Sequence, residues 1–290
     1  MKKSIKKLLQ KSLTLIDQGD YSGILSREEV AKITPSSLLS YYGNIHSQRG
    51  QDGILAEIFR RLHLERGMFV EFGAWDGMYL SNCRHLFEKG WSGVYIEGDK
   101  SRFEKLKKTY AGYDDIYTVN SFVGAPKHGF SGEKLSTILD KSQINLNDIS
   151  FVSIDVDGAD LEIFQEMGFK PPVVLVEGGF NFSPDLKKRI PDSIAWANLQ
   201  QPLSVIIEAA DELDYVPVCF YQDTYFVRKD LCAPFLSVNT GARSLYSDAF
   251  SFMPMDFRQY ILAFRQKNAV IKQIESEYFG HFNADPLSYE

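Results

Sequence analysis

The sequence predicts a single α/β domain built on a doubly wound, mostly parallel seven-stranded sheet of the Rossmann-like kind, with helical additions at both ends. Short β-branched or aromatic runs alternate with helical patterns between about residues 67 and 228. The last two of these runs are separated by so few residues that they must pair antiparallel. A chain of 290 residues, 44% of them apolar, is long enough to bury one full core.

The predicted strands are short runs rich in β-branched and aromatic residues, at 68–72, 93–97, 116–119, 151–154, 173–176, 216–220 and 225–228. The clearest helical patterns between them cover 101–110, 159–167 and 203–213. The chain therefore divides into three parts: a helical lead-in (1–66), a core (67–231), and a C-terminal helical extension (232–290). The extension belongs to the same domain or forms a dimer contact, and its pattern at 256–279 predicts one long helix.

Composition excludes several classes of protein. A formal net charge of −6 argues against a general nucleic-acid binder, which would carry a basic face. No apolar run approaches the roughly 18 residues needed to span a bilayer, so we expect no stable membrane insertion. The three cysteines, Cys83, Cys219 and Cys232, are odd in number and far apart, which indicates neither a disulfide framework nor a zinc site. We therefore expect a cytoplasmic protein with a small or polar partner.

The N-terminal 16 residues, MKKSIKKLLQKSLTLI, form an amphipathic pattern. Apolar side chains fall on one helical face and lysines surround them. Polar residues interrupt the apolar run and no small-residue cleavage site follows, unlike a signal peptide. The pattern predicts a helix docked on the body of the protein or on a second subunit of a homodimer, and binding to a membrane surface is the alternative.

In an open parallel sheet, ligands bind beyond the carboxyl ends of the strands, so the first strand-to-helix turn in "FVEFGAWDGMYLSN" (69–82) is a candidate binding loop. It is not the GxGxxG fingerprint of pyrophosphate binding. Glu71 ends the strand, where a carboxylate would repel a pyrophosphate and favour a cationic or amine-bearing ligand. Around it are small residues that allow close backbone approach and polar residues that can bind a carboxylate or an amine. These predicted binding residues are Gly73, Ala74, Asp76, Gly77, Ser81 and Asn82.

The next two strand ends point to adenosine. Glu97, followed by Gly98, ends the second strand in "GVYIEGD", where an acidic residue typically accepts hydrogen bonds from both ribose hydroxyls. The third strand leads into "VNSFVG", where Ser121 would meet the edge of an adenine and Phe122 its face. A ligand with an amino-acid end near Glu71 and a ribose at Glu97 is S-adenosylmethionine. Each residue alone is also typical of an ordinary turn, and their order on successive strands favours the cofactor.

These motifs, together with "SQRGQDGIL" (47–55), "FVSIDVDGADLEIF", "PPVVLVEGG" and "YFVRKDL", resemble the FkbM-type branch of class I S-adenosylmethionine-dependent methyltransferases over about residues 44–231. The resemblance implies the class I fold with a reversed last strand, and methylation of a sugar or polyketide hydroxyl. Many such proteins lie in bacterial surface-polysaccharide clusters. The match departs after Glu177, where an Asn commonly follows closely and this chain has Gly178 and Gly179.

Methyl transfer to an alkyl hydroxyl needs a general base, or a cation that stabilises the alkoxide. Asp155 and Asp157 follow the fourth strand in "SIDVDGAD", and Glu177 ends the strand expected beside it. Three carboxylates there would repel one another unless a proton, a sulfonium or a divalent metal intervenes. Asp157 is the candidate base, although an aspartate here also suits a helix cap near residue 159. His46 is the second candidate base.

Resemblance to sugar O-methyltransferases with a DxD at this place implies that Asp155 and Glu177 hold Mg²⁺ and that Asp157 takes the proton. Asp155 also lies where the cofactor is expected. Other readings stay open: methylation of nitrogen, methylation of a phosphate-type or phosphoramidate oxygen, or a non-catalytic scaffold in polysaccharide assembly.

The pocket for the small-molecule or glycan acceptor is expected from segments 1–50, 178–200 and 230–256. Aromatic residues in or near these segments either stack on sugar rings or pack in the core: Phe180, Phe182, Trp196, Tyr246 and Phe250.

Overall fold

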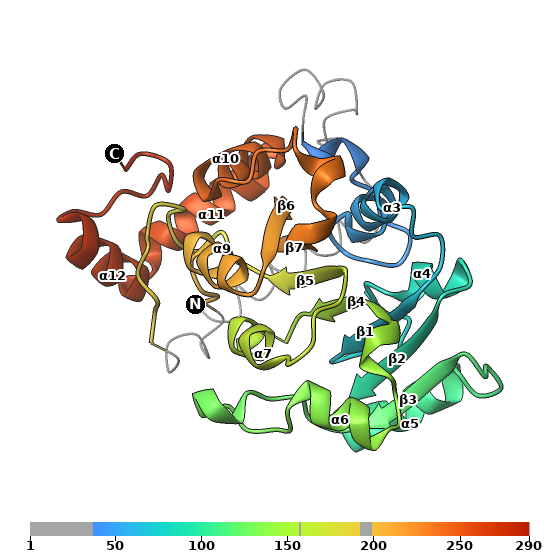
Figure 1. Cartoon of the computed structure of the whole chain (residues 1–290). Helices are drawn as coiled ribbons and strands as arrows, with labels where there is room; N and C mark the ends of the chain where they lie inside the picture. The colour runs from blue at the N-terminus through green and yellow to red at the C-terminus, as the bar shows by residue number, and fades with distance from the viewer. Residues whose placement is uncertain (1–36, 157, 192–198, 290) are drawn as a thin grey trace.

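The structure, a computed structural model, describes residues 37–156, 158–191 and 199–289. The predicted N-terminal amphipathic helix, Asp157 and Trp196 lie outside these residues. Seven strands form one sheet in the order β3-β2-β1-β4-β5-β7-β6 (Figure 1). β7 is antiparallel to both of its neighbours, and the other pairs are parallel. The predicted fold class is confirmed.

Every predicted strand is present, with ends that differ from the prediction by no more than two residues. The strands are β1 (Met68–Phe72), β2 (Ser92–Glu97), β3 (Ile116–Asn120), β4 (Ile149–Ile154), β5 (Val173–Glu177), β6 (Tyr215–Tyr221) and β7 (Asp223–Arg228). The described α-helices are α3 (Gln51–Arg61), α4 (Arg84–Glu88), α5 (Lys100–Thr109), α6 (Leu135–Lys141), α7 (Asp160–Glu166), α9 (Leu203–Glu212), α10 (Ala242–Phe252), α11 (Met255–Lys267) and α12 (Ala269–Phe279).

The sheet is buried on both faces, which explains why its strands are almost continuously apolar. Successive side chains of one strand enter different clusters, as Phe69 and Val70 of β1 do. The cluster with Phe69 contains side chains of α3, α4, α5 and α10, and the cluster with Val70 contains side chains of α6, α7 and α9. Leu39, from the predicted lead-in, is buried with Phe69, so the described part of the lead-in shares the core.

Strand order reverses between β1 and β4, because β2 and β3 extend to one side of β1 while β4 and β5 extend to the other. The parallel strands β1, β2, β4 and β5 end at the same edge of the sheet. The antiparallel β7 begins at that edge, where its first residue, Asp223, pairs in register with Glu177. Such a switch point is where open α/β sheets bind ligands.

The prediction of one long helix over 256–279 is wrong, because the chain forms two helices, α11 and α12, that meet at Asn268. Asn268 has an extended backbone with ψ of 110°, and its side chain accepts hydrogen bonds from the backbone N–H groups of Val270 and Ile271. This N-cap begins α12 in a new direction. Helical spacing continues across the break, so the apolar pattern alone does not reveal it.

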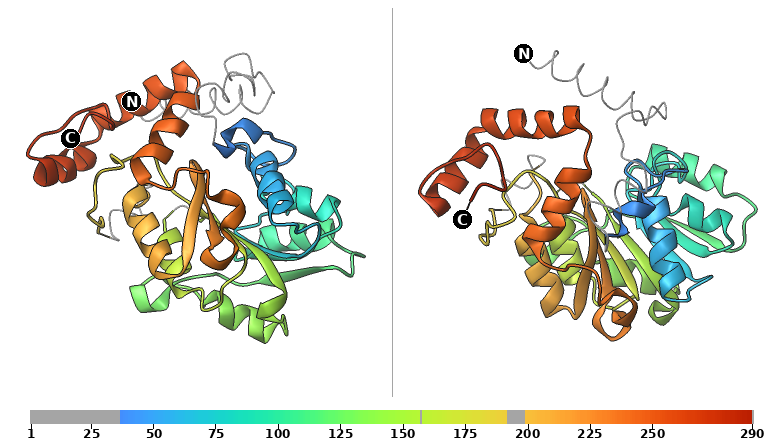
Figure 2. Two further views of the ribbon diagram at one scale, coloured as in Figure 1. Left: turned by 45° about the horizontal axis from the view of Figure 1, so that its top comes forward. Right: turned by 90° about the horizontal axis from the view of Figure 1, so that it is seen from above.

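α11 and α12 are joined to each other by an ion pair between Arg265 and Glu275, both fully buried, with Nη2 and Oε2 2.7 Å apart. Arg265 also donates to the carbonyl oxygen of Asn181, and Glu275 accepts from the backbone N–H of Ser183. The extension is therefore joined to the segment that follows β5. Figure 2 shows α10 to α12, coloured orange to red, beside the sheet, with α12 furthest from it.

Replacing Arg265 with Met is expected to lower the free energy of unfolding by about 3–5 kcal/mol, because Glu275 would be left buried without its ionic partner. Urea unfolding followed by circular dichroism measures this difference. The double variant Arg265→Met, Glu275→Leu should recover part of the loss. If the extension were a separate unit, the variant would instead show an early partial transition while the main transition stayed at the wild-type urea concentration.

Candidate functional site at the carboxyl ends of the strands

A polar cavity of about 280 Å³ opens at the carboxyl edge of β4 and β5. Three carboxyl groups, four side-chain amides and one guanidinium border it. The lining residues are Gln48, Arg49, Gln51, Leu80, Asn82, Asp155, Glu177, Gln222 and Asp223. Asp155 and Glu177 thus lie on one cavity, as their strand ends predicted, and Asn82 joins them from the segment after β1. Glu177 accepts a hydrogen bond of 2.9 Å from the side chain of Gln200.

Glu71 supports the binding loop from inside the protein. Its carboxylate accepts hydrogen bonds from the Ser81 hydroxyl at 2.6 Å and from the backbone N–H groups of Asn82 and Cys83 at 3.0 and 3.2 Å. Burial raises the pKa of Glu71 to about 7, although these hydrogen bonds favour the charged form. The side chain predicted to meet the ligand therefore fixes the segment 81–83, and the Ser81 hydroxyl points to Glu71.

The other residues of the β1 turn shape its backbone. Asp76 accepts hydrogen bonds from the backbone N–H groups of Met78 and Tyr79, which closes the turn. Gly77 has φ of 72°, and a Cβ there would lie 2.4 Å from the Tyr110 ring, so only glycine fits. Asp76 and Gly77 thus have local structural reasons for their identity, which fits the ordinary-turn alternative.

Gly73 and Ala74 lie between the end of β2 and the end of β4. The Ala74 N–H donates to the carbonyl oxygen of Ile96 in β2. A Cβ on Gly73 would lie 3.5 Å from the carbonyl oxygen of Asp155, so the turn also lies against the end of β4. A ligand that crosses this turn would reach from the end of β2 to the cavity.

Glu97 holds the turns after β1 and β2 together. Its two oxygens accept hydrogen bonds from the backbone N–H groups of Trp75 at 2.8 Å and Asp99 at 2.7 Å. A carboxylate offers about four acceptor positions, so Glu97 retains capacity for a diol. Beside it, the Phe122 ring is 68% exposed and lies over Gly98, where a Cβ would come within 2.2 Å of that ring.

Ser121, predicted to meet an adenine edge, precedes Phe122 in the segment that follows β3. Its backbone N–H donates to the carbonyl oxygen of Glu97. His46, the second candidate base, is not among the residues that line the cavity. Its Nε2 lies 2.8 Å from a carboxylate oxygen of Glu88 in α4, so the structure does not bring it together with Asp155.

One wall of the cavity comes from the segment 44–52, which lies in the predicted lead-in and contains His46 and the start of the "SQRGQDGIL" motif. The Asp52 carboxylate accepts hydrogen bonds from the backbone N–H groups of Ile45, His46 and Ser47 and folds this segment over the edge of the sheet. Gln51 then donates to Asp223 at 2.7 Å. The motif "SQRGQDG" was the available signal, but its contacts lie too far along the chain for local spacing to show them.

Two buried acids near the cavity were also missed. Asp223 is 2% exposed, and burial followed by the charge of Asp155 raises its pKa well above the ordinary range. The same two causes raise the pKa of Asp160 to about 7. Asp160 accepts hydrogen bonds from the backbone N–H groups of Val156 and Gly158 and so holds the turn after β4.

No group of three or more His, Cys, Asp or Glu side chains within 37–156, 158–191 and 199–289 is arranged to hold a metal ion. Asp155 and Glu177 share the cavity, and Asp157 is outside the described residues, so Mg²⁺ at this site stays a prediction.

Most of the aromatic residues for which stacking on sugars and core packing were the alternatives belong to the core. Phe180, Phe182 and Tyr246 are buried, and Phe250 packs against the core. No helix in the part of the chain that the structure describes is long and apolar enough to cross a membrane.

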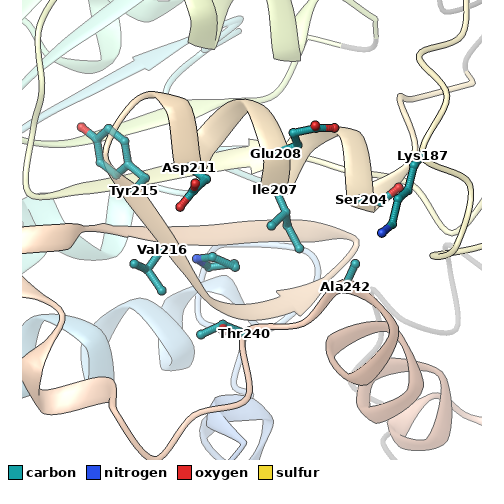
Figure 3. Close-up of a pocket in the computed structure, with 10 residues that line it drawn as sticks. Lys187, Ser204, Ile207, Glu208, Asp211, Tyr215, Val216, Thr240 and Ala242 are labelled. Carbon is teal, nitrogen blue, oxygen red and sulfur yellow. The ribbon is translucent and has the colours of Figure 1, made fainter.

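A second cavity, of about 440 Å³, lies between α9 and the start of β6 (Figure 3). Ile207, Glu208 and Asp211 of α9 line one side, and Val216 and Ala242 lie across from them. β6 runs parallel to β5, so its first residues are at the opposite edge of the sheet from the strand ends. This cavity is therefore separate from the candidate site.

No family model matches the chain, and no curated protein matches its sequence. Among solved structures, the methyltransferase PaMTH1 of Podospora anserina with S-adenosylhomocysteine bound is 11% identical, with 70% of this chain and 85% of that chain covered and a TM-score of 0.38. TrmK of M. capricolum, with the same compound, is 12% identical, with 76% and 92% covered and a TM-score of 0.39. The fibrillarin pre-rRNA processing protein of Methanococcus jannaschii is 12% identical, with 56% and 66% covered and a TM-score of 0.35.

The sheet order and the reversed β7 are those of the class I methyltransferase fold. At these identities and TM-scores the likenesses say nothing about the reaction or the substrate of this chain. The FkbM-type branch stays a prediction from the motifs.

The raised pKa of Glu71 predicts how stability depends on pH. Between pH 4.5 and 7 the folded protein keeps a proton on Glu71 that the unfolded chain releases. The free energy of unfolding should therefore fall as pH rises through this window, by on the order of 3 kcal/mol from this group. Urea unfolding at pH 5 and pH 8 measures the difference, which should shrink in Glu71→Gln.

Glu57→Gln is a matched control for this experiment. Glu57 is also buried, but its hydrogen bond to Arg60 lowers its pKa to about 2, so it is charged in both states from pH 5 to 8. This variant should keep the wild-type difference between the two pH values. A Glu71→Gln protein with an undiminished difference would show that Glu71 titrates normally in the folded state.

Proposed function

We propose that this protein is an S-adenosylmethionine-dependent methyltransferase that acts on a hydroxyl of a sugar or polysaccharide precursor. The observation that carries the proposal is the position of Glu97. Its carboxylate ends β2, is fixed by two backbone N–H groups, and retains acceptor capacity beside the exposed face of Phe122. In a class I fold this combination suits the ribose and adenine of the cofactor.

The amino-acid end of the cofactor would then cross the β1 turn at Gly73 and reach the acid-lined cavity. A sulfonium and an ammonium are both positive, and Asp155 and Glu177 supply negative charge there. Asn82, whose amide donates to Ser153 and has a second N–H, lies on the same wall. In this arrangement Glu71 acts indirectly, because it holds the segment that carries Asn82.

Methyl transfer requires that the acceptor hydroxyl lose a proton as its oxygen bonds to the methyl carbon. S-adenosylmethionine supplies the methyl group on a sulfonium, which leaves as a neutral thioether. Asp157 is the proposed base that takes the proton, with Asp155 two residues before it on the cavity. If Mg²⁺ is bound, Asp155 and Glu177 would hold it, and it would lower the pKa of the hydroxyl.

The cavity lining supports a polyhydroxylated acceptor. Its amides and carboxyls exchange hydrogen bonds with hydroxyl groups readily, and its one aliphatic lining residue is Leu80. The side-chain oxygen of Gln222 is buried and accepts no hydrogen bond from the described residues. A hydroxyl donated to this oxygen would satisfy it.

An amine acceptor is the second candidate, favoured by the excess of acidic groups in the cavity: three carboxyls, Asp155, Glu177 and Asp223, face one guanidinium, Arg49. A neutral amine needs no strong base, so N-methylation would depend less on Asp157.

Replacing Glu97 with Gln or Ala should weaken S-adenosylhomocysteine binding about 10- to 100-fold, because the charged acceptor for the ribose is lost. Isothermal titration calorimetry gives the dissociation constants. Glu208→Ala, on the wall of the second cavity, is the control and should bind like the wild type. If a folded Glu97→Gln protein bound S-adenosylhomocysteine with unchanged affinity, the proposed position of the ribose at Glu97 would be wrong.

Asp157→Asn should lower turnover by about 10² to 10⁴ with little change in cofactor affinity, because the amide keeps the size and loses the basicity. Turnover is measured as methyl transfer from labelled cofactor to candidate acceptors, with and without a chelator. Loss of activity with chelator and recovery with Mg²⁺ would support a metal on Asp155 and Glu177. Near-normal turnover of the Asp157→Asn protein, unchanged by chelator, would contradict both the base role of Asp157 and the metal. It would favour an amine acceptor or a different base.

A further inference from the structure

Among the described residues that line the cavity, Arg49 is the one with a positive charge, and that charge partly opposes the rise in the pKa of the nearby Asp223. Within 37–156, 158–191 and 199–289, no carboxylate forms an ion pair with it. Its backbone is fixed, because the Arg49 N–H donates to the side chain of Gln51 at 2.5 Å. A guanidinium held at a cavity without a paired carboxylate is suited to binding an anion from solution.

Aromatic side chains continue outward from Arg49 along α11. The guanidinium carbon lies 5.2 Å from the centre of the Phe257 ring. Phe257 is nearly parallel to Tyr260, with ring centres 6.1 Å apart and an interplanar angle of 6°. Tyr260 is 37% exposed, and its ring lies 6.3 Å from that of Phe264. We call Phe257 and Tyr260 the aromatic row.

Three chemical features are thus adjacent: carboxyls and amides in the cavity, a guanidinium at its border, and the aromatic row beyond. Carboxyls and amides bind hydroxyls, a guanidinium binds the paired oxygens of a carboxylate or phosphate, and aromatic faces pack against the C–H face of a sugar ring. A cation–π contact with Phe257 needs no N–H donor of the guanidinium, so these N–H groups can donate to an anion.

We propose that Arg49 and the aromatic row form an acceptor subsite for an anionic sugar, whose carboxylate or phosphate pairs with Arg49 while its hydroxyls face Asp155 and Gln222. The methyl transfer to such a sugar rests on the proposed function. The anion preference does not, because Arg49 and the aromatic row are present whether or not the cofactor binds.

Ligand-observed NMR titrations of the full-length protein test this subsite with three probes: glucuronic acid, glucose 6-phosphate and neutral glucose. Each is measured with and without saturating S-adenosylhomocysteine. An anionic sugar should bind at least about 10-fold more tightly than glucose. A stronger response to glucuronic acid identifies a carboxylate as the anion, and a stronger response to glucose 6-phosphate identifies a phosphate. Equal binding of all three sugars would overturn the proposal.

Variants separate this subsite from general electrostatic attraction. Arg49→Gln should abolish the preference for the anionic sugar over glucose. Tyr260→Ser should weaken all three sugars alike, since it removes stacking and not charge. Lys187→Gln, which removes a cation at the second cavity, is the control and should keep the preference. Preference retained in Arg49→Gln would overturn the proposal.

Failure of the proposed function has a different signature. Wild-type protein that prefers the anionic sugar but does not bind S-adenosylhomocysteine would retain the subsite and contradict the methyltransferase assignment. Protein that binds S-adenosylhomocysteine but shows no preference among the sugars would retain the cofactor site and contradict the anionic-sugar subsite.

Discussion

The candidate site depends on buried carboxylates that accept hydrogen bonds from backbone N–H groups of the loops around it. Asp52 folds the segment 44–50, Glu71 fixes 81–83, Glu97 joins the turns after β1 and β2, and Asp160 holds the turn after β4. Each loop at the carboxyl edge would otherwise bury N–H groups without partners, at a cost of about 1–3 kcal/mol each. A parallel sheet brings its strand ends to one edge, and these acids turn that edge into a shaped binding surface.

The acidic residues at this edge of the sheet have different roles. Glu71 and Asp160 accept hydrogen bonds from backbone N–H groups and affect a ligand only through the loops that they hold. Asp155, Glu177 and Asp223 line the cavity and are placed to meet a ligand directly. Glu97 does both, because it joins two turns and keeps acceptor capacity. Burial and the charge of Asp155 also keep the local pKa values high, so a cationic ligand in the cavity would relieve repulsion among these groups.

Short-range periodicity and strand order in the sequence predict all seven strands and the reversed β7. They also predict that Asp155 and Glu177 lie at the same edge of the sheet. They miss Arg49 and Asp223, because the fold of the 44–52 segment over the sheet depends on Asp52 and on a contact between Gln51 and Asp223, which are far apart in the chain. The apolar spacing continues unchanged across Asn268, so it does not predict that α11 ends there. The end of α11 and the start of α12 depend on one capping side chain, that of Asn268.

In the proposed arrangement, one ligand spans from Glu97 to the acid-lined cavity. A crystal structure of the protein grown with S-adenosylhomocysteine tests this most directly. We expect the ribose hydroxyls within hydrogen-bond distance, about 2.5–3.2 Å, of Glu97. The adenine should lie against Phe122, and the sulfur beside the cavity that Asp155 and Glu177 line. Density for the compound at the second cavity, or no density at the strand ends at saturating concentration, would contradict this arrangement.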